Sequence, residues 1–433
     1  MPVWRGRRSR VAEELVDQPD KVAEELVDQP DKVAEELVDQ PDKVAETTEF
    51  RFTDEQGQLR AAVRKFGAEY FDEQTVRRLM ESEPRFDPAV WARLGAELGV
   101  LGLAVPEADG GAGGTLVDQA VAVEELGAAL ACGPLIGTVY LSIPALVAAS
   151  AGPVRDELLG ALVEGARTAA FAVPDRAGAF DPALVGVTAS ADATLTGTVE
   201  RIVDGAAADV FLVAATAPDG VALYAVDASD VQRTPLTTLD LTRPQATIAL
   251  TDTPGRLVSG PGEAERVIGH ALQVGAALLA VEQVGAAQHL LDLSVDYAKS
   301  RLQFGRPIGS FQAVKHRLAD DLVDLEHARS AAYHAVWALA DGSDDPALAA
   351  SIAQATASAA LTKIATDTIQ VHGGIGFTWE HQAHLYFKRA TTDAALLGTA
   401  EAHRDRIAEL ILDRAVSDQA TIDRAPRVAT GTN

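Results

Sequence analysis

The sequence has little cysteine, few aromatic side chains and little positive charge. Cys132 is the one cysteine among 433 residues, so the chain cannot form an internal disulfide, which fits a protein of the reducing cytoplasm. Lys and Arg number 37 against 63 Asp and Glu, which gives a formal charge of −26. Such a field repels nucleic-acid phosphates and anionic lipid, so we expect neither nucleic acid nor a membrane surface as a partner.

Long uninterrupted hydrophobic runs are also missing. The most apolar stretch, residues 135–151, contains Ser142 and Pro144, which favours a buried helix over a membrane span. The four arginines in the first ten residues are not followed by an apolar segment, so no secretory signal is expected. We therefore predict a cytoplasmic protein. Its 47% hydrophobic and 23% charged residues are a globular composition.

A tandem repeat occupies the start of the chain. The unit VAEELVDQPDK occurs three times from Val11 and begins a fourth copy at Val44. The proline in each copy interrupts a helix after barely two turns, and helices that short are marginal in water. We interpret residues 1–49 as a disordered extension that arose by duplication or from a start codon assigned too far upstream. A docking tail is the alternative.

The remaining sequence divides by its periodicity into three parts and a tail. Residues 50–166 show helical spacing, with a helix start at Asp87, whose following proline suits the first turn. Residues 167–262 contain short β-branched runs between turn residues, and helical spacing returns in residues 263–415. Residues 416–433 are expected to be a flexible tail. The predicted fold class is α+β, mostly α: an N-terminal helical domain, a small middle β domain and a C-terminal four-helix bundle.

Two segments near the C-terminus resemble motifs of the acyl-CoA dehydrogenases. Residues 301–312 (RLQFGRPIGSFQ) resemble the R-x-x-F-G segment and the glutamine that follows it, and residues 370–377 (QVHGGIGF) resemble a Q-x-x-G-G-x-G-F segment. Three more segments match in the family's order, namely residues 103–107, 124–127 and 284–288. The resemblance spans residues 50–415. It implies an FAD-dependent oxidoreductase that dehydrogenates an acyl-CoA thioester, works as a tetramer and passes electrons to an acceptor protein.

The resemblance also assigns residues to the cofactor. An arginine presents a planar fork of donors suited to a pyrophosphate, and glycines let the backbone approach an adenosine diphosphate group closely. In the family, the groups of the two C-terminal motifs contact FAD that a neighbouring subunit mainly holds. The implied cofactor-binding residues are Arg301, Phe304, Gln312, Gln370, Gly373, Gly374 and Thr399. His316 and His372 lack metal-ligand spacing and are expected to be structural, so no metal is predicted.

The chain departs from the family at the catalytic base. Abstraction of the α-proton needs a group within hydrogen-bond reach of that C–H bond. The family's glutamate stands in a Y-E-G-T segment, which corresponds here to residues 396–399 and places Leu397 at the base position. Some members carry the base on the preceding long helix, at the position of Gly275. Neither residue accepts a proton, so no catalytic residue is predicted.

Three other carboxylates lie near these positions. Glu282 follows Gly275 by about 10 Å of helical rise, which puts it too far away to replace the base. Asp393 is expected to be solvated, or paired with Lys388 or Arg389. Glu401 is the third.

The segments that hold a chain's own flavin are altered as well. The family's T-E-P-G-A-G-S-D turn corresponds to residues 172–177 (AVPDRA), and its W-I-T-N strand corresponds to residues 201–204 (RIVD). Aromatic and hydroxyl partners of a flavin ring are therefore missing. What survives is the set that reaches a neighbour's FAD. This pattern resembles the unequal-subunit dehydrogenases of actinobacteria, in which one chain lacks the base.

Three hypotheses follow. The first is a base-lacking, FAD-supporting subunit that pairs with a second acyl-CoA dehydrogenase-type chain in a heterotetramer acting on an acyl-CoA. The second is an active homo-oligomeric dehydrogenase with a displaced base. The third is a flavin-free scaffold, against which the retention of Arg301 and Gln370 argues.

Overall fold

A computed structural model describes residues 52–424 of the protein, with side chains to residue 412. The repeat and the rest of the extension expected over residues 1–49 lie outside this range, as do residues 425–433. The chain forms two units, Met1–Thr53 and Asp54–Asn433, and every element below belongs to the second unit.

The N-terminal part of this unit is helical. Its longer helices are α4 (Asp54–Tyr70), α5 (Glu73–Leu79), α6 (Pro88–Ala96), α7 (Leu116–Ala128), η3 (Leu135–Ser142), α8 (Ile143–Ala148) and α9 (Pro153–Val163), with the short turns η1 (Val100–Gly102) and η2 (Glu107–Asp109) between α6 and α7. The predicted start at Asp87 is present, since its carboxylate accepts hydrogen bonds from the amides of Ala89 and Val90. The element η3 is a π-helix, and all of its residues are buried.

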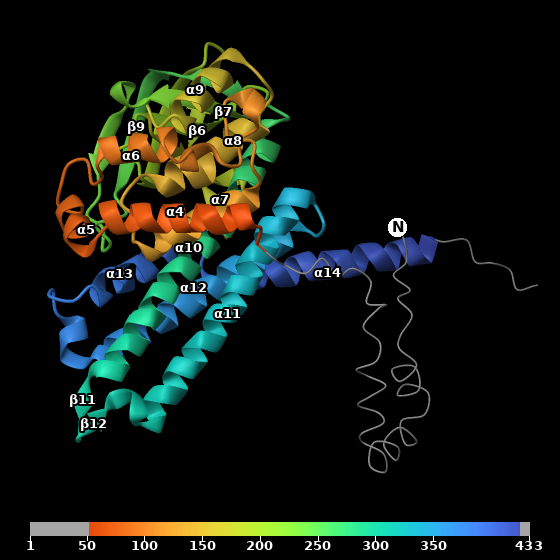
Figure 1. Cartoon of the computed structure of the whole chain (residues 1–433). Helices are drawn as coiled ribbons and strands as arrows, with labels where there is room; N and C mark the ends of the chain where they lie inside the picture. Colours follow the sequence, from red (N-terminus) through yellow and green to blue (C-terminus); the bar gives the residue numbers. More distant parts are fainter. Residues whose placement is uncertain (1–51, 425–433) are drawn as a thin grey trace, which may run out of the picture. The chain divides into compact units, whose positions relative to one another are not determined.

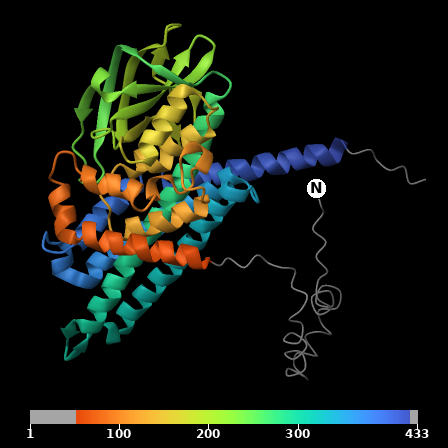
Figure 2. The ribbon, with the colours of Figure 1, turned by 45° about the horizontal axis from the view of Figure 1, so that its top comes forward.

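The middle part is built on an eight-stranded sheet. Its strands are β1 (Ala169–Ala172), β4 (Val187–Ala189), β5 (Thr194–Val203), β6 (Val210–Ala217), β7 (Gly220–Asp227), β8 (Gln232–Pro235), β9 (Gln245–Pro254) and β10 (Arg256–Ser259). The strand order is β10-β7-β6-β4-β5-β9-β8, and β1 pairs with β6 in parallel. A separate hairpin, β2 (Asp175–Arg176) and β3 (Ala179–Phe180), follows β1, and the turns η4 (Pro182–Leu184) and η5 (Ala228–Asp230) complete this part. Figure 2 shows the sheet at one end of the unit.

Long helices form the C-terminal part. They are α10 (Ala264–Ser300), α11 (Gln312–Asp341), α12 (Pro346–His372), α13 (Ala383–Asp393) and α14 (Ala400–Arg424). The hairpin of β11 (Leu302–Gln303) and β12 (Arg306–Pro307), with the turn η6 (Ile308–Ser310), joins α10 to α11, and η7 (Gly373–Phe377) follows α12. In Figures 1 and 2 this hairpin lies at the opposite end of α10 from the sheet. The α14 helix continues into the segment 416–433 that was expected to be a tail.

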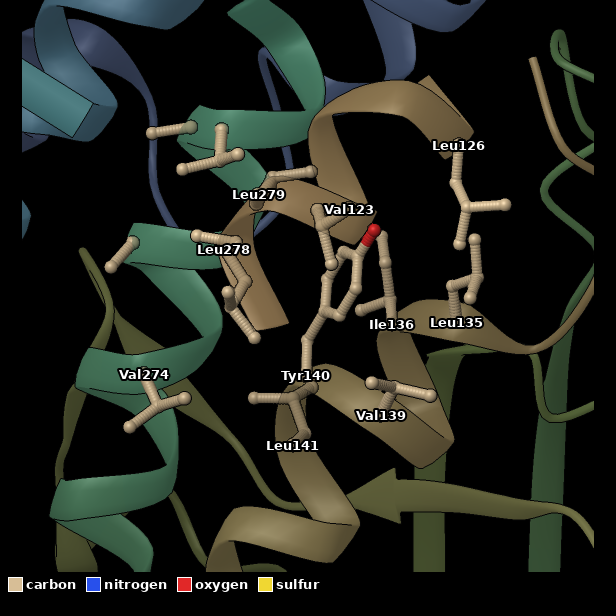
Figure 3. Packing of buried hydrophobic residues seen from close by; sticks show 14 of the residues in the cluster. Val123, Leu126, Leu135, Ile136, Val139, Tyr140, Leu141, Val274, Leu278 and Leu279 are labelled. Atoms are coloured by element: carbon tan, nitrogen blue, oxygen red, sulfur yellow. The ribbon is translucent and has the colours of Figure 1, made fainter. Parts of the chain in front are cut away.

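Helix α10 is the central helix of the unit. Among the described residues it is the one helix long and apolar enough to cross a bilayer, but 83% of its apolar window is buried inside the protein. It contacts α7, α11, α12 and η3. Figure 3 shows Tyr140 and Leu141 of η3 packed among side chains of α7 and α10, including Val123 and Val274. The predicted fold class, helices around a middle β domain with a C-terminal helical bundle, is confirmed.

Two of the sequence motifs meet where α7 crosses α10. A Cβ atom added to Gly285 would lie 1.9 Å from the backbone oxygen of Glu124, and one added to Gly127 would lie 2.3 Å from the backbone oxygen of Glu282. Only glycine allows backbones to approach this closely. The segments 124–127 and 284–288 therefore fix a helix crossing.

Candidate functional site

A cavity of about 860 Å³ lies between the sheet, the η3–α10 pair and the loop that joins α13 to α14. Its volume is within the range of small-molecule sites. Apolar side chains dominate the lining, among them Ile136, Leu141, Phe171, Val187, Leu239, Leu272, Leu396 and Leu397; polar ones include Asp175, Thr198, Glu200, Arg201, Gln245, Thr391, Thr392 and Thr399. The cavity is lined by residues of the segments 172–177 and 201–204, which the sequence resemblance aligned with a family member's own flavin site.

The two base positions meet at this cavity. A Cβ atom added to Gly275 would lie 3.3 Å from Cδ1 of Leu397 and 2.5 Å from Cδ2 of Leu141. Leu141 and Leu397 are 3% and 8% exposed, so the junction is closed and apolar. The structure thus brings together the positions implied separately by the resemblance, and neither carries an acid or base.

The loop at Leu397 keeps a constrained backbone. Leu397 has φ +54°, a left-handed conformation that is uncommon for a side chain other than glycine. The buried His403 ring donates from Nε2 to the Leu397 carbonyl at 2.8 Å, and the β2–β3 turn packs against the loop, where a Cβ on Gly398 would lie 2.5 Å from Cα of Ala177. The loop is therefore held firmly, and Thr399 lines the cavity beside it.

The altered strand at 201–204 does not present a flavin cradle. Arg201 is exposed at the cavity with φ +56°, and the position of the family's hydroxyl is Val203. Asp204 is buried, and its Oδ2 accepts a hydrogen bond from the amide of Gly137 at 2.8 Å, so it holds η3. Burial raises the pKa of the Asp204 carboxyl to about 6.

Two acidic residues line the cavity, Asp175 and Glu200, and the sequence analysis singled out neither. Asp175 of β2 lines the cavity, and its Oδ1 accepts a hydrogen bond from the amide of Gly178 at 2.9 Å. Burial raises the pKa of this carboxyl. The sequence places Asp175 in the altered T-E-P-G-A-G-S-D turn but gives no sign that its side chain meets the cavity.

Glu282 is held in a buried ionic cluster, so it does not serve as a base. Its Oε1 accepts from Arg243 and, at 2.6 Å, from Arg389, while its Oε2 accepts from the Tyr140 hydroxyl at 2.8 Å. Burial alone would raise the pKa of Glu282, but the two guanidinium groups outweigh it and lower the pKa.

The expectation for Asp393 is wrong. Asp393 is 1% exposed, and its partner is Arg243, whose Nε lies 3.5 Å from its Oδ1. Arg389 instead forms ion pairs with Glu282 and Asp240. The Nε atom of Arg389 lies 2.8 Å from Oδ2 of Asp240. Burial raises the pKa of Asp393 to about 7. Helical spacing predicts only partners on the same helix, so it could not predict the pairing of Asp393 with Arg243.

Six of the seven predicted cofactor residues lie away from the cavity, around the far ends of α10, α11 and α12. We call this region the apex; the residues are Arg301, Phe304, Gln312, Gln370, Gly373 and Gly374, and all are exposed. The stacked rings of Tyr297 and His372, 4.4 Å apart, bring the ends of α10 and α12 into contact. His372 itself is buried and donates from Nδ1 to the Thr368 carbonyl, as expected for a structural histidine. Thr399 is separate from this group.

The apex has the chemistry of an anion-binding and partner-binding surface. In a chain of charge −26 it carries the cations Lys299, Arg301, Arg306, Lys315 and Arg317 within one short stretch of sequence. Among the described residues, Arg301 forms no ion pair, whereas Arg317 pairs with Asp367. Phe304 is 92% and Phe377 is 82% exposed. Large exposed apolar groups of this kind mark interaction sites.

The apex and the cavity differ in what they offer to FAD. At the apex, Gly373 has φ +64° with open space around it, and Arg301 is available to a phosphate, so this surface fits part of a cofactor presented from outside. At positions 201–204 the cavity offers no aromatic or hydroxyl side chain, and its aromatic and hydroxyl groups come from Phe171, Thr198, Thr391, Thr392 and Thr399 instead. Among the described residues, no cluster of three or more His, Cys, Asp or Glu could hold a metal.

Comparisons with known proteins agree with the sequence resemblance. Residues 53–166 match the acyl-CoA dehydrogenase N-terminal domain and residues 265–412 match the acyl-CoA dehydrogenase C-terminal domain. The chain is 37% identical over 352 residues to acyl-CoA dehydrogenase IpdE2 of Mycolicibacterium smegmatis, covering 80% of this chain and 95% of that protein.

Solved structures give the same result. One chain of the Tcur3481–Tcur3483 steroid ACAD variant superposes with a TM-score of 0.75 at 32% identity, covering 84% of this chain and 99% of that one. A chain of the ChsE4–ChsE5 complex of Mycobacterium tuberculosis superposes with a TM-score of 0.76 at 29% identity and the same coverage. The protein therefore belongs to the acyl-CoA dehydrogenase family, whose FAD-dependent members are oxidoreductases acting on CH–CH donors.

Proposed function

We propose that this chain is the base-lacking subunit of a heteromeric acyl-CoA dehydrogenase. In this assembly it pairs with a second family chain, forms a cytoplasmic heterotetramer and supports α,β-dehydrogenation of an acyl-CoA. The second chain supplies the catalytic carboxylate and most of the FAD site, and an electron-transfer protein accepts the electrons. The two solved structures named above contain two differently named components each, which supports the unequal pairing.

The observation that carries the proposal is the apolar junction of the two base positions. Leu397 and Gly275 face one another with no proton acceptor on either. A general base must lie within hydrogen-bond reach of the proton that it removes, so this junction cannot perform the first step. The apex, by contrast, retains its arginine, glutamines and glycines on an exposed surface. This contrast supports a chain that contributes to a neighbour's cofactor site and has no base of its own at the family positions.

The chain's own residues would then act at the apex. Arg301 would neutralise a pyrophosphate, Gly373 and Gly374 would let the backbone approach the adenosine, and Gln312 and Gln370 would donate or accept hydrogen bonds. The FAD, when bound, supplies the acceptor for the substrate's β-hydride. Phe304 would exclude water from this contact by packing against the adenine or ribose. Thr399, which lies at the cavity, would have no role in the neighbour's cofactor site.

One observation favours the second hypothesis, an active dehydrogenase with a displaced base. Asp175 lines the cavity, and burial raises the pKa of its carboxyl. It lies in the hairpin that touches the Leu397 loop, because a Cβ on Gly178 would lie 3.1 Å from the Leu397 carbonyl oxygen. The family's base positions are nevertheless Leu397 and Gly275, so we rank this alternative second.

The role of Arg301 gives a direct test. Each charge-assisted hydrogen bond to a phosphate contributes roughly 1.5–3 kcal/mol, so Arg301→Ala in the co-purified complex should weaken FAD retention at least tenfold on dilution. Lys299→Ala is the matched control, since Lys299 is an exposed cation that pairs with Asp296 of its own helix. Subunit assembly should persist in both variants. Equal FAD retention in Arg301→Ala and the unmodified complex would remove Arg301 from the cofactor site.

A further inference from the structure

We propose that Leu141 fills the place in which this cavity would otherwise receive the reacting carbons of an acyl thioester, and that it is the residue that confines thioester binding to the partner chain's site. The inference rests on the proposed function, because it explains how one chain of the complex is kept from binding substrate unproductively. It concerns a residue outside every sequence motif.

The position of the reacting carbon follows from the two base positions. A glutamate at position 275 and a glutamate at position 397 would each remove the same substrate proton. The carbon that bears this proton would therefore lie within about 3 Å of a carboxylate placed at either position. In this chain those positions converge, with Leu397 Cδ1 placed 3.3 Å from a Cβ at residue 275. The reacting carbon would therefore have to lie at the junction itself.

Leu141 occupies that junction. Its Cδ2 would be 2.5 Å and its Cγ 3.3 Å from a Cβ at residue 275, whereas contacts below 3.0 Å are essentially never observed for a real Cβ. Even a methyl group at residue 275 thus requires Leu141 to move. The reacting carbons of a thioester, together with the groups attached to them, need more room than a methyl group and would meet the same Leu141 side chain.

Leu141 has little freedom to move away. It belongs to the π-helix η3, which is buried along its whole length and lies between α10 and β1. Neighbouring groups fix η3 from two sides: Asp204 accepts from the Gly137 amide, and the Thr138 hydroxyl donates to the Ala169 carbonyl at 3.0 Å. Tyr140, the preceding residue, is tied to Glu282. The side chain of Leu141 is therefore presented to α10 by a fixed backbone.

A stability cycle measures this contact without cofactor or partner. Gly275→Ala should lower the melting temperature of the chain, Leu141→Ala should lower it as well, and the double variant should be no less stable than Leu141→Ala alone, because the added methyl group enters the vacated space. Gly269→Ala, on the same helix with open space around it, is the control and should not lower the melting temperature. Additive effects in the double variant would overturn the proposal.

A labelling experiment tests the part that concerns the thioester. In Gly275→Cys/Leu141→Ala, bromoacetyl-CoA should alkylate the new thiol, with the sulfur displacing bromide from the thioester's α-carbon, and mass spectrometry should detect the CoA adduct. Leu141→Ala alone controls for Cys132, which is buried. Gly275→Cys/Val139→Ala is the second control. Val139 lies on the same π-helix as Leu141 but lines a different pocket, so its truncation should not open the junction.

We expect labelling at least tenfold faster in Gly275→Cys/Leu141→Ala than in Gly275→Cys alone or Gly275→Cys/Val139→Ala. Should Gly275→Cys alone fail to fold, Gly275→Cys/Leu141→Val supplies the comparison and should react at an intermediate rate. Equal rates with and without Leu141 would overturn the proposal. Reaction of the double variant with iodoacetamide but not with bromoacetyl-CoA would overturn its thioester part. Neither outcome would alter the flavin content of the complex, which tests the proposed function separately.

Discussion

Replacement of Asp393 by asparagine tests the electrostatics of the buried cluster that joins the three parts of the unit. The cluster sets two guanidinium groups against four carboxylates; its members are Arg243, Arg389, Asp204, Asp240, Glu282 and Asp393, all buried. With every carboxylate ionised it would hold an excess of negative charge. Neither oxygen of Asp393 has a hydrogen-bond partner in the part of the chain that the structure describes, which makes this carboxylate the one least supported in its charged form.

The magnitude follows from the pKa of Asp393, which burial raises from 3.8 to about 7. A carboxyl whose pKa is raised by folding contributes stability that is fully present below pH 3.8 and is lost as the pH rises through 7. Each pKa unit corresponds to about 1.4 kcal/mol, so the loss reaches roughly 4 kcal/mol above pH 7. Asparagine resembles the protonated carboxyl in shape and cannot ionise, so the variant avoids this loss.

Thermal unfolding from pH 5 to pH 8.5 is the assay. At pH 5, which lies above 3.8, part of this loss has already occurred in the unmodified protein. We therefore expect the variant to be slightly more stable at pH 5 and several degrees more stable than the unmodified protein at pH 8.5. Asp204, whose pKa is about 6, and His384, whose pKa is lowered to about 4, also contribute to the pH dependence, but their contributions are common to both proteins and largely cancel in the difference. A difference that does not change with pH would refute the assignment of a protonated Asp393.

Two further predictions concern the cavity and the helix crossing. Asp175→Asn should leave the dehydrogenase activity of the complex within about twofold if Asp175 is not a base, whereas a loss of 10²-fold or more in kcat would favour the displaced-base hypothesis. Gly285→Ala should destabilise the chain by about 3 kcal/mol or more in chemical unfolding, because the new methyl group meets the backbone of Glu124. The control Gly269→Ala, on the same helix, should not destabilise the chain. Equal effects of the two substitutions would show that the crossing is not tightly packed.

The fold was accessible from the sequence because its signals are local. Helical spacing, the cap at Asp87 and the β-branched runs each specify an element without knowledge of distant contacts. The motif at 370–377 likewise marks the end of a helix whose glycine, Gly373, requires a positive φ. Local patterns of this kind survive in a single sequence.

The site was only partly accessible, because its decisive contacts join distant residues. Leu141 is an ordinary apolar residue by sequence, and its importance appears only when η3 places it against Gly275. Asp393 was assigned to neighbours on its own helix, although its partner Arg243 belongs to the β part. The sequence grouped Thr399 with the apex residues, whereas the structure places it in the cavity. These are tertiary relationships that periodicity does not encode.

The flavin content of the purified protein tests the central claim most directly. The ratio of FAD to chain would be measured from the absorption spectrum and total protein, for the chain alone and for the complex with its partner. The proposed function predicts a colourless or poorly loaded chain alone and a yellow complex that contains fewer flavins than chains. One tightly bound FAD per chain in a homo-oligomer would contradict it.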